Sequence, residues 1–246
     1  MKNPGYQPRT YRSICRHGGL VSFAVGIKES DLFIRAEADL SGPAAEKLKE
    51  LRSDLECYIV CDQEFQTSLV PVTIRESAPD IVRDMAQAAA RVGVGPMAAV
   101  AGAIAEQVAR HLARFSKEVV VENGGDIFII SEQPMIVAIY AGASPLSMKL
   151  GVELPPAPQG LSICTSSGTV GHSFSFGKTD AVVVVAKSGS FADAAATAFG
   201  NMVKTAEDIG PALDRAKQQN DVLGAVVVLG EKIGFFGDTI KLVEIE

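Results

Sequence analysis

Asp193 and Thr197 are the two residues whose types and spacing best suit metal chemistry. They lie four residues apart in Ser190-Phe191-Ala192-Asp193-Ala194-Ala195-Ala196-Thr197-Ala198. On a helix their oxygen atoms would therefore project from one face, about one turn apart. Mg²⁺ completes its shell with water and substrate phosphates, so one carboxylate, one hydroxyl and a backbone carbonyl would suffice. The alternative is a capping box, in which Ser190 and Asp193 serve the start of their own helix.

A glycine-bearing corner precedes another predicted helix, in the segment Gly93-Val94-Gly95-Pro96-Met97-Ala98-Ala99. The glycines allow a sharp turn, and Pro96 suits the first helical position. Backbone N–H groups at such a helix start can bind an anion such as a pyrophosphate. Gly95 and Met97 are therefore candidate ligand contacts, and a plain corner between two helices is the alternative.

The segment Glu122-Asn123-Gly124-Gly125-Asp126 lies between two predicted strands. An Asn-Gly or Gly-Gly pair is typical of a tight hairpin turn, because the central residues of such a turn need positive φ. A turn alone would explain the segment. Two carboxylates beside a backbone free of side chains would also suit a bound ribose or base edge, so all five residues are candidate ligand contacts.

A loop rich in hydroxyl groups leaves a later strand, in Cys164-Thr165-Ser166-Ser167-Gly168-Thr169-Val170-Gly171-His172-Ser173. Four of its residues are candidate donors to phosphate oxygens: Thr165, Ser166, Ser167 and Gly168. His172 is the candidate catalytic residue, as a proton shuttle or a hydrogen-bonding partner of the ligand, because its unperturbed pKa lies close to working pH. The alternative is an ordinary surface loop.

The cysteines indicate neither a disulfide scaffold nor a zinc site. The four of them are too sparse and dispersed for a scaffold in a chain of 246 residues, so reduced thiols are expected. Cys57 and Cys61 would be neighbours on a helix, but no further Cys or His lies nearby at zinc-ligand spacing. We therefore expect both to be core thiols.

Helices and strands come in clusters along the chain, which favours an α+β fold over a doubly wound parallel sheet. The apolar pattern predicts helices opened by Ser41 and over 80–90, 97–114, 190–203 and 208–219. A hairpin is expected over 20–25 and 31–38, and a meander over 119–122, 126–131, 135–140 and 161–165. The continuous apolar run 181–186 predicts a strand buried on both faces, and the last strands are expected at 222–229, 233–236 and 240–245.

Composition excludes several classes of protein. A hydrophobic content of 47% supplies a sizeable core, and we expect one domain over residues 1–246. The net charge of -6 without a long basic run argues against a nucleic-acid partner. The segment 1–16 has no apolar core of a secretory signal, and the longest apolar stretch, 85–112, is interrupted by Arg91, Glu106 and Arg110. We therefore expect a cytoplasmic protein without a membrane span.

The order of these segments resembles the ApbE family of FAD:protein FMN transferases. A glycine-bearing helix start, Glu-Asn-Gly-Gly-Asp, Thr-Ser-Ser-Gly with a following His, and Ala-Asp-Ala-Ala-Ala-Thr-Ala follow one another over about 93 to 203. Asp193 and Thr197 fall on the family's Mg²⁺-binding Asp and Thr, and Gly124-Gly125-Asp126 on its Gly-Gly-Asp turn. The family's Lys-Gly after the corner and its Asp-Pro-x-Thr-Gly run after the His are absent. The chain is therefore more similar to a small ApbE-like subfamily of anaerobic bacteria and archaea.

The resemblance implies an ApbE-like (T-fold-like) α+β architecture with antiparallel or mixed sheets and packed helices. It also implies FAD and Mg²⁺ as cofactors, His172 near the flavin, and an acceptor protein that receives FMN while AMP is released. Mg²⁺ would neutralise charge on the phosphate oxygens while the protein positions the groups. The alternatives are an FAD pyrophosphatase, a non-catalytic FAD-binding module, and an accessory factor in sulfide assimilation into homocysteine, with Cys164 as its sulfur carrier.

Overall fold

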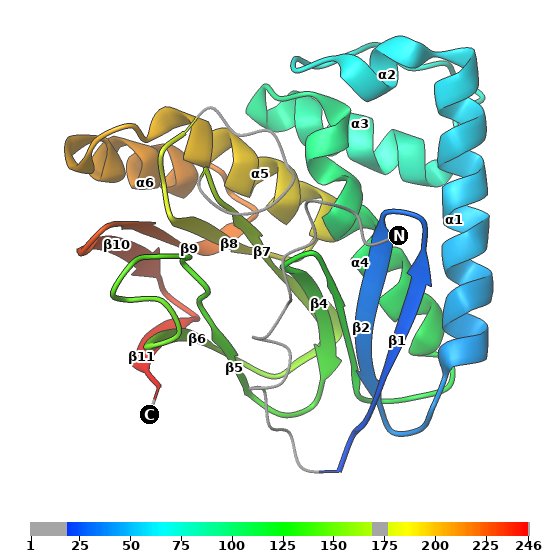
Figure 1. Ribbon diagram of the computed structural model, residues 1–246, viewed down its shortest axis with the longest axis horizontal. Coiled ribbons are helices and arrows are strands. Elements are labelled where there is room, and N and C mark those ends of the chain that lie inside the picture. The colour runs from blue at the N-terminus through cyan, green and yellow to red at the C-terminus, as the bar shows by residue number, and fades with distance from the viewer. Residues whose placement is uncertain (1–18, 169–176, 246) are drawn as a thin grey trace.

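Two antiparallel sheets form the centre of the protein, for which the computed structural model describes residues 19–168 and 177–245. The larger sheet has eight strands in the order β1-β2-β3-β4-β7-β8-β9-β10 (Figure 1). Its strands are β1 (Val21–Ile27), β2 (Ser30–Ala36), β3 (Val119–Asn123), β4 (Asp126–Ser131), β7 (Ala157–Ser166), β8 (Ala181–Ala186), β9 (Val222–Leu229) and β10 (Lys232–Gly237). The smaller sheet has the order β11-β6-β5 and consists of β5 (Met135–Ala138), β6 (Leu150–Leu154) and β11 (Lys241–Glu244).

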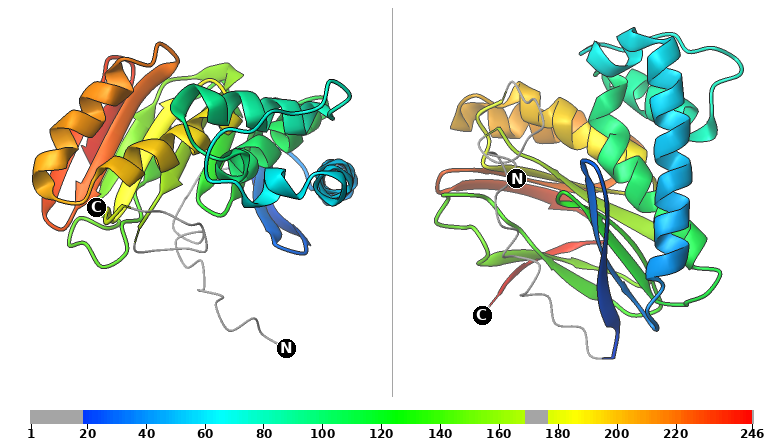
Figure 2. Two further views of the ribbon diagram at one scale, coloured as in Figure 1. Left: turned by 90° about the horizontal axis from the view of Figure 1, so that it is seen from above. Right: turned by 45° about the vertical axis from the view of Figure 1, so that its right-hand side comes forward.

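The helices gather on one side of the large sheet, and the small sheet lies on the other (Figures 1 and 2). α4 (Val100–Leu112) packs on β3 and β4, α5 (Gly189–Met202) on β7 and β8, and α6 (Ile209–Lys217) on β9 and β10. The outer helices are α1 (Ser41–Cys61), α2 (Gln63–Thr67) and α3 (Asp80–Val92). Two short 3-10 helices, η2 (Pro96–Ala99) and η3 (Ala206–Asp208), lead into α4 and α6. This arrangement confirms the predicted α+β class.

β8 shows why its sequence is apolar throughout. Successive side chains of a strand point to opposite faces. Val182 and Val184 lie in the core under the helices, while Val183 and Val185 lie in the core between the two sheets. The prediction of a strand buried on both faces is therefore confirmed, although its neighbours are antiparallel.

The predicted meander is wrong in one respect. After β4 the chain leaves the large sheet: β5 pairs with β6 in the small sheet, and β4 takes β7 as its next neighbour. β6 was not predicted. Its five residues do alternate, with Leu150, Val152 and Leu154 apolar, so the short pattern was overlooked. A Cβ atom added to Gly151 would lie 2.9 Å from side-chain atoms of Ile136 and Ile245, so a larger residue there would force those side chains to move.

Candidate functional site

Two of the predicted motifs, the turn between β3 and β4 and the segment of α5 that carries Asp193, meet where the N-terminal ends of α4 and α5 cross. At the crossing, Gly102 of α4 and Gly189 of α5 leave no room for side chains. A Cβ atom added to Gly102 would lie 2.2 Å from the Gly189 carbonyl oxygen, and one added to Gly189 would lie 2.3 Å from the Gly102 carbonyl oxygen. The turn between β3 and β4 reaches the same place, because Asn123 Nδ2 donates a hydrogen bond to the Ala101 carbonyl oxygen (3.2 Å).

Asp193 points from α5 toward the start of α4. Its Oδ2 atom accepts a hydrogen bond from the Gly102 N–H (2.9 Å), one of the N–H groups in the first turn of α4 that the helix itself leaves unpaired. The cap of α5 is Ser188, whose Oγ atom accepts from the Phe191 N–H (3.3 Å). The alternative of a Ser190–Asp193 capping box is therefore wrong. Thr197 lies one turn further along α5 and is partly exposed.

Asp126 brings a second carboxyl group to Asp193. Asp126 is buried, and its Oδ1 atom accepts a hydrogen bond from the Thr165 N–H (3.1 Å), which ties the end of β7 to the turn. Burial raises the pKa of Asp126 to about 7, against the opposing hydrogen bonds from Thr165 and Cys164. Burial and the Asp126 carboxylate also raise the pKa of Asp193. Among the described residues, no cationic side chain offsets this repulsion.

The remaining residues of the β3–β4 turn have structural partners. Gly124 and Gly125 have φ values of 70° and 105°, as a tight turn requires. Glu122 Oε1 accepts a hydrogen bond from the Gly125 N–H (2.8 Å). These contacts support the turn interpretation of Glu122, Asn123, Gly124 and Gly125, and their ligand contacts stay a prediction.

The loop after β7 folds back on the segment that enters β8. The Gly168 N–H donates to the Thr179 carbonyl oxygen (2.9 Å), and Ser167 Oγ donates to the same oxygen (3.5 Å). Ser166 is buried. The Thr179 hydroxyl is buried without a hydrogen-bond partner among the described residues. His172, the predicted catalytic residue, lies outside the described residues.

The glycine corner has a packing explanation. Gly93 ends α3 in the left-handed conformation (φ 80°), as is common at helix C-termini. A Cβ atom added to Gly95 would lie 1.9 Å from the Ser68 carbonyl oxygen, so only glycine fits there. Pro96 is the first residue of η2, as predicted for a helix start, and Met97 follows it. Contacts of Gly95 and Met97 with a ligand stay a prediction.

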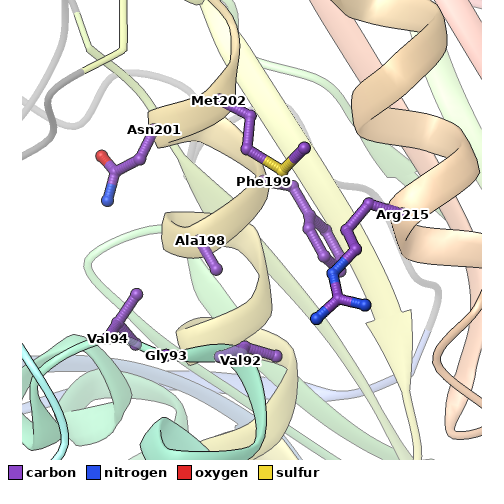
Figure 3. A pocket seen from close by; sticks show the side chains of 8 residues that line it. All are labelled: Val92, Gly93, Val94, Ala198, Phe199, Asn201, Met202 and Arg215. Atoms are coloured by element: carbon purple, nitrogen blue, oxygen red, sulfur yellow. The ribbon is translucent and has the colours of Figure 1, made fainter.

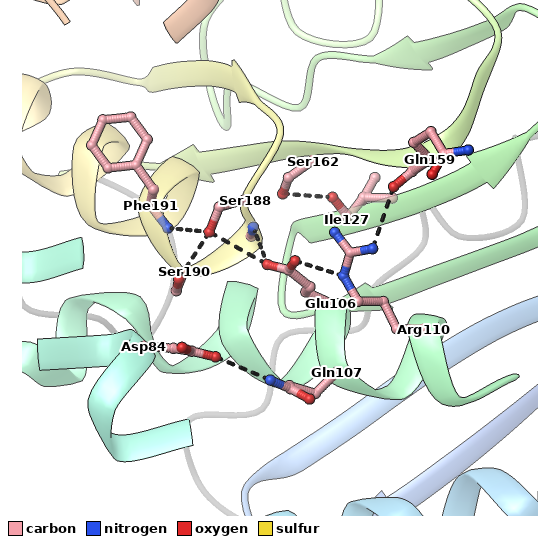
Figure 4. Close-up of polar contacts among 11 residues, drawn as sticks. Asp84, Glu106, Gln107, Arg110, Ile127, Gln159, Ser162, Ser188, Ser190 and Phe191 are labelled. Carbon is pink, nitrogen blue, oxygen red and sulfur yellow. Dashed lines mark hydrogen bonds and ion pairs between the residues drawn. The ribbon is translucent and has the colours of Figure 1, made fainter. Parts of the chain in front are cut away.

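Glu106 is a site residue that the sequence did not reveal. Its Oε2 atom accepts hydrogen bonds from the Gly189 N–H (2.6 Å) and Ser188 Oγ (3.4 Å) at the start of α5 (Figure 4). Its Oε1 atom accepts from Arg110 Nε (2.8 Å). α4 thus supplies a carboxylate to the start of α5, while α5 supplies Asp193 to the start of α4. No local pattern signals a contact between residues 83 positions apart.

The donor set suits a hard cation whose shell is shared with a ligand. No group of three or more His, Cys, Asp or Glu side chains within 19–168 and 177–245 is arranged to hold a metal ion. The buried Asp126 carboxyl group and the partly exposed Asp193 carboxyl group, with Thr197 one helical turn beyond Asp193, fit Mg²⁺, which uses few protein ligands and takes the rest from water and phosphates.

A pocket of about 170 Å³ lies between α3, α6 and the C-terminal end of α5 (Figure 3). Its walls are mostly apolar, and polar atoms come from Asn201 and Arg215. Asn201 lies one turn beyond Thr197 on α5, and Gly93 belongs to the glycine corner. The remaining lining residues are Val92, Val94, Ala198, Phe199 and Met202.

The cysteines differ from the expectation of core thiols. Cys57 and Cys61 are exposed on α1, and only Cys164 is buried among the described cysteines. The Cys164 Sγ atom lies 3.2 Å from Ser162 Oγ. Burial raises the pKa of the Cys164 thiol, and the carboxylates of Asp126 and Asp193 raise it further. A reactive thiolate is therefore disfavoured at Cys164.

We expect iodoacetamide to distinguish these thiols at pH 8. Cys57 and Cys61 should be alkylated in the native protein, whereas Cys164 should react only after unfolding in urea, because its thiol is enclosed and stays protonated. Peptide mapping by mass spectrometry measures each site. Native alkylation of Cys164 at the rate of Cys57 would contradict the described burial.

The family model described as "AbpE bacteria" matches residues 12–232. The chain belongs to this family. A UPF0280 protein of Methanocella arvoryzae is 41% identical over 218 residues, covering 88% of this chain and 89% of that protein. A UPF0280 protein of Methanococcus aeolicus is 39% identical over 226 residues, covering 89% and 91%.

Solved structures share the fold of this family member. The flavinyl transferase ApbE of Pseudomonas stutzeri, in its apo form, has a TM-score of 0.55 at 16% identity and covers 88% of this chain and 93% of its own. The ApbE protein of Thermotoga maritima has a TM-score of 0.56 at 12% identity, covering 87% and 96%. At these identities the likeness shows a common ApbE-like fold, as the sequence resemblance implied.

No single helix within the described residues is long and apolar enough to cross a membrane. Asp80–Val92 and Pro96–Leu112 satisfy the criteria only when taken together, as a pair bent by 104°.

Proposed function

We propose that this protein binds FAD with Mg²⁺ at Asp193 and Thr197 and transfers the FMN half to a hydroxyl group of an acceptor protein. The observation that carries the proposal is the pair of neighbouring carboxyl groups, the buried Asp126 and the partly exposed Asp193, for whose repulsion no cationic side chain among the described residues compensates. A divalent cation would remove this repulsion and attract a diphosphate to the same place. The family membership and the ApbE-like fold favour a flavin nucleotide as the diphosphate.

The chemical step is a phosphoryl transfer. A P–O bond forms between the acceptor oxygen and the FMN phosphorus, the P–O bond to the bridging oxygen of the diphosphate breaks, and AMP leaves with that oxygen while the acceptor hydroxyl loses its proton. Mg²⁺ would neutralise charge on the phosphate oxygens. The described residues would hold and orient: Asp193 and Thr197 hold the ion, and the pocket beside Asn201 leaves room for part of the nucleotide. His172 remains our candidate for the proton transfer.

Two related functions remain candidates for the same site. With water as acceptor, the step becomes FAD pyrophosphatase activity, and with no acceptor the protein is a binding module. An accessory role in sulfide assimilation is less favoured, because the buried Cys164 with its raised pKa makes a poor sulfur carrier.

We expect FAD with Mg²⁺ to raise the melting temperature of the protein by several degrees. Ligand at a hundredfold excess over its Kd stabilises a native state by about 2.7 kcal/mol, which for this size is worth about 2–4 °C per kcal/mol. Asp193→Asn should remove the part of the shift that depends on Mg²⁺, whereas Asp238→Asn, at an exposed position, should not. No shift with FAD in the unaltered protein refutes the proposal.

Product analysis separates the three activities. Flavin bound covalently to an acceptor peptide, together with AMP, indicates transfer. Free FMN with AMP indicates pyrophosphatase activity, and an FAD-dependent shift without AMP indicates a binding module.

A further inference from the structure

We propose that Glu106 is a positioning residue for this site: its carboxylate fixes where α5 crosses α4, and thereby where Asp193 stands. The inference rests on the proposed role of Asp193 as a metal ligand. Glu106 lies outside every motif that the sequence singled out. It acts through the start of α5 and does not itself touch the metal.

The first part of the argument is the reciprocal contact between the two helices. Glu106 of α4 accepts the Gly189 N–H at 2.6 Å, and Asp193 of α5 accepts the Gly102 N–H at 2.9 Å. Each carboxylate thus satisfies an N–H group that the other helix leaves unpaired and lies at the positive end of its dipole. A displacement of α5 along α4 would break both hydrogen bonds together.

The second part is that Glu106 is itself fixed to the large sheet. Its Oε1 atom pairs with Arg110 Nε (2.8 Å), and the Glu106 side chain is only 16% exposed. The Arg110 guanidinium lies over the Phe128 ring, 4.9 Å from its centroid, and its Nη1 atom donates to the Gln159 carbonyl oxygen (3.3 Å) (Figure 4). Glu106 therefore connects the start of α5, through Arg110, to β4 and β7, and so fixes where α5 lies over the sheet.

The third part is the close packing of the α4 and α5 backbones where the two helices cross. A Cβ atom on Gly102 would lie 2.2 Å from the Gly189 carbonyl oxygen, and a Cβ atom on Gly189 would lie 2.3 Å from the Gly102 carbonyl oxygen. Asp126 belongs to β4 and Asp193 to α5, so the spacing of the two carboxyl groups depends on how α5 lies over the sheet. Residues that orient metal ligands without touching the metal typically change metal affinity 10- to 100-fold when removed.

The test compares three variants of the full chain. Glu106→Ala removes the contact with α5. Glu106→Gln keeps an oxygen for the Gly189 N–H but loses the charge. Gln107→Ala is the matched control: it lies next to Glu106 on α4 and breaks a contact of similar length, from Gln107 Nε2 to Asp84 Oδ2 (3.0 Å), that is directed to α3 and not to α5 (Figure 4).

Two readouts are measured for each variant. The first is the Mg²⁺ concentration that gives half of the thermal shift in the presence of FAD. The second is amide hydrogen exchange at Gly102, which reports whether Asp193 still accepts that N–H. We expect Glu106→Ala to raise the half-saturating Mg²⁺ concentration about tenfold or more and to speed exchange at Gly102. Glu106→Gln should restore most of both values, and Gln107→Ala should change neither.

The outcomes separate this inference from the proposed function. If the unaltered protein shows no Mg²⁺-dependent shift, the proposed function fails, while exchange at Gly102 still decides whether Glu106 positions Asp193. If Glu106→Ala leaves exchange at Gly102 and the half-saturating Mg²⁺ concentration the same as in Gln107→Ala, the positioning role is refuted.

Discussion

Asp126→Asn raises the melting temperature of the metal-free protein at pH 8 and has little effect at pH 4. Burial raises the pKa of Asp126 to about 7, so between its ordinary value and pH 7 the native state keeps a proton that the unfolded state has lost. Stability therefore falls as pH rises through this window. Full ionisation costs the native state up to roughly 4 kcal/mol, and the neutral amide avoids that cost while its oxygen can still accept the Thr165 N–H.

The measurement is thermal unfolding from pH 4 to pH 8 in buffer with EDTA, so that no divalent cation offsets the charge. Asp238→Asn serves as control because Asp238 is exposed, and surface substitutions usually change stability by less than about 0.5 kcal/mol. The difference in melting temperature between Asp126→Asn and the unaltered protein should increase as the pH rises. A difference in melting temperature that does not change with pH would show that the Asp126 carboxylate is well solvated or paired in the native state.

The same unfolding measurement with Mg²⁺ tests whether the two carboxyl groups, Asp126 and Asp193, bind the cation. If the cation lies between the carboxyl groups and the nucleotide, Mg²⁺ with FAD should stabilise the unaltered protein most at pH 8, where both groups must be ionised. On the proposed function, the repulsion of Asp126 and Asp193 would be a cost of the metal-free state that the bound cation removes.

Local patterns in the sequence were sufficient for most of the fold. Leu48, Leu51, Leu55 and Tyr58 recur at helical spacing and are all buried in α1, and the hairpin of β1 and β2 lies where alternation predicted it. Local patterns cannot predict which strands pair with one another. β4 pairs with β7, and the chain between them supplies β5 and β6, two of the three strands of the second sheet.

The candidate site also has some features that local spacing predicted and others that depend on the packing of distant segments. The four-residue spacing of Asp193 and Thr197 predicted that both lie on α5, and the structure places them there. The capping box failed because α5 begins at Gly189, so that Ser188 is the cap and Asp193 is available to α4. The Glu106–Gly189 contact depends on the packing of distant segments and has no signal in the sequence. The approach of Asp126 to Asp193 has no local signal either, and only the resemblance to the ApbE family implied that both belong to one site.

Gly102→Ala is expected to destabilise the protein by about 2–3 kcal/mol, in a helix position where alanine would ordinarily be preferred. Replacing a helical glycine by alanine gains roughly 0.5–1 kcal/mol. Here the added Cβ would lie 2.2 Å from the Gly189 carbonyl oxygen and 2.8 Å from Asp193 Cβ, so α4 and α5 must move apart. Overpacking of this kind typically costs 1–3 kcal/mol or more, and the shift also weakens the Gly102–Asp193 hydrogen bond.

Gly200→Ala provides the matched control on the other member of the same helix pair. A Cβ atom at Gly200 would meet its nearest neighbours, Thr179 Oγ1 and Val182 Cγ2, at an ordinary 3.7 Å, so this variant should melt at the same temperature or slightly higher. Gly102→Ala should melt roughly 4–12 °C lower, at about 2–4 °C per kcal/mol. Equal melting temperatures would mean that α4 and α5 can separate at no cost, and a crossing that yields so easily could not hold Asp193 in place for a metal ion.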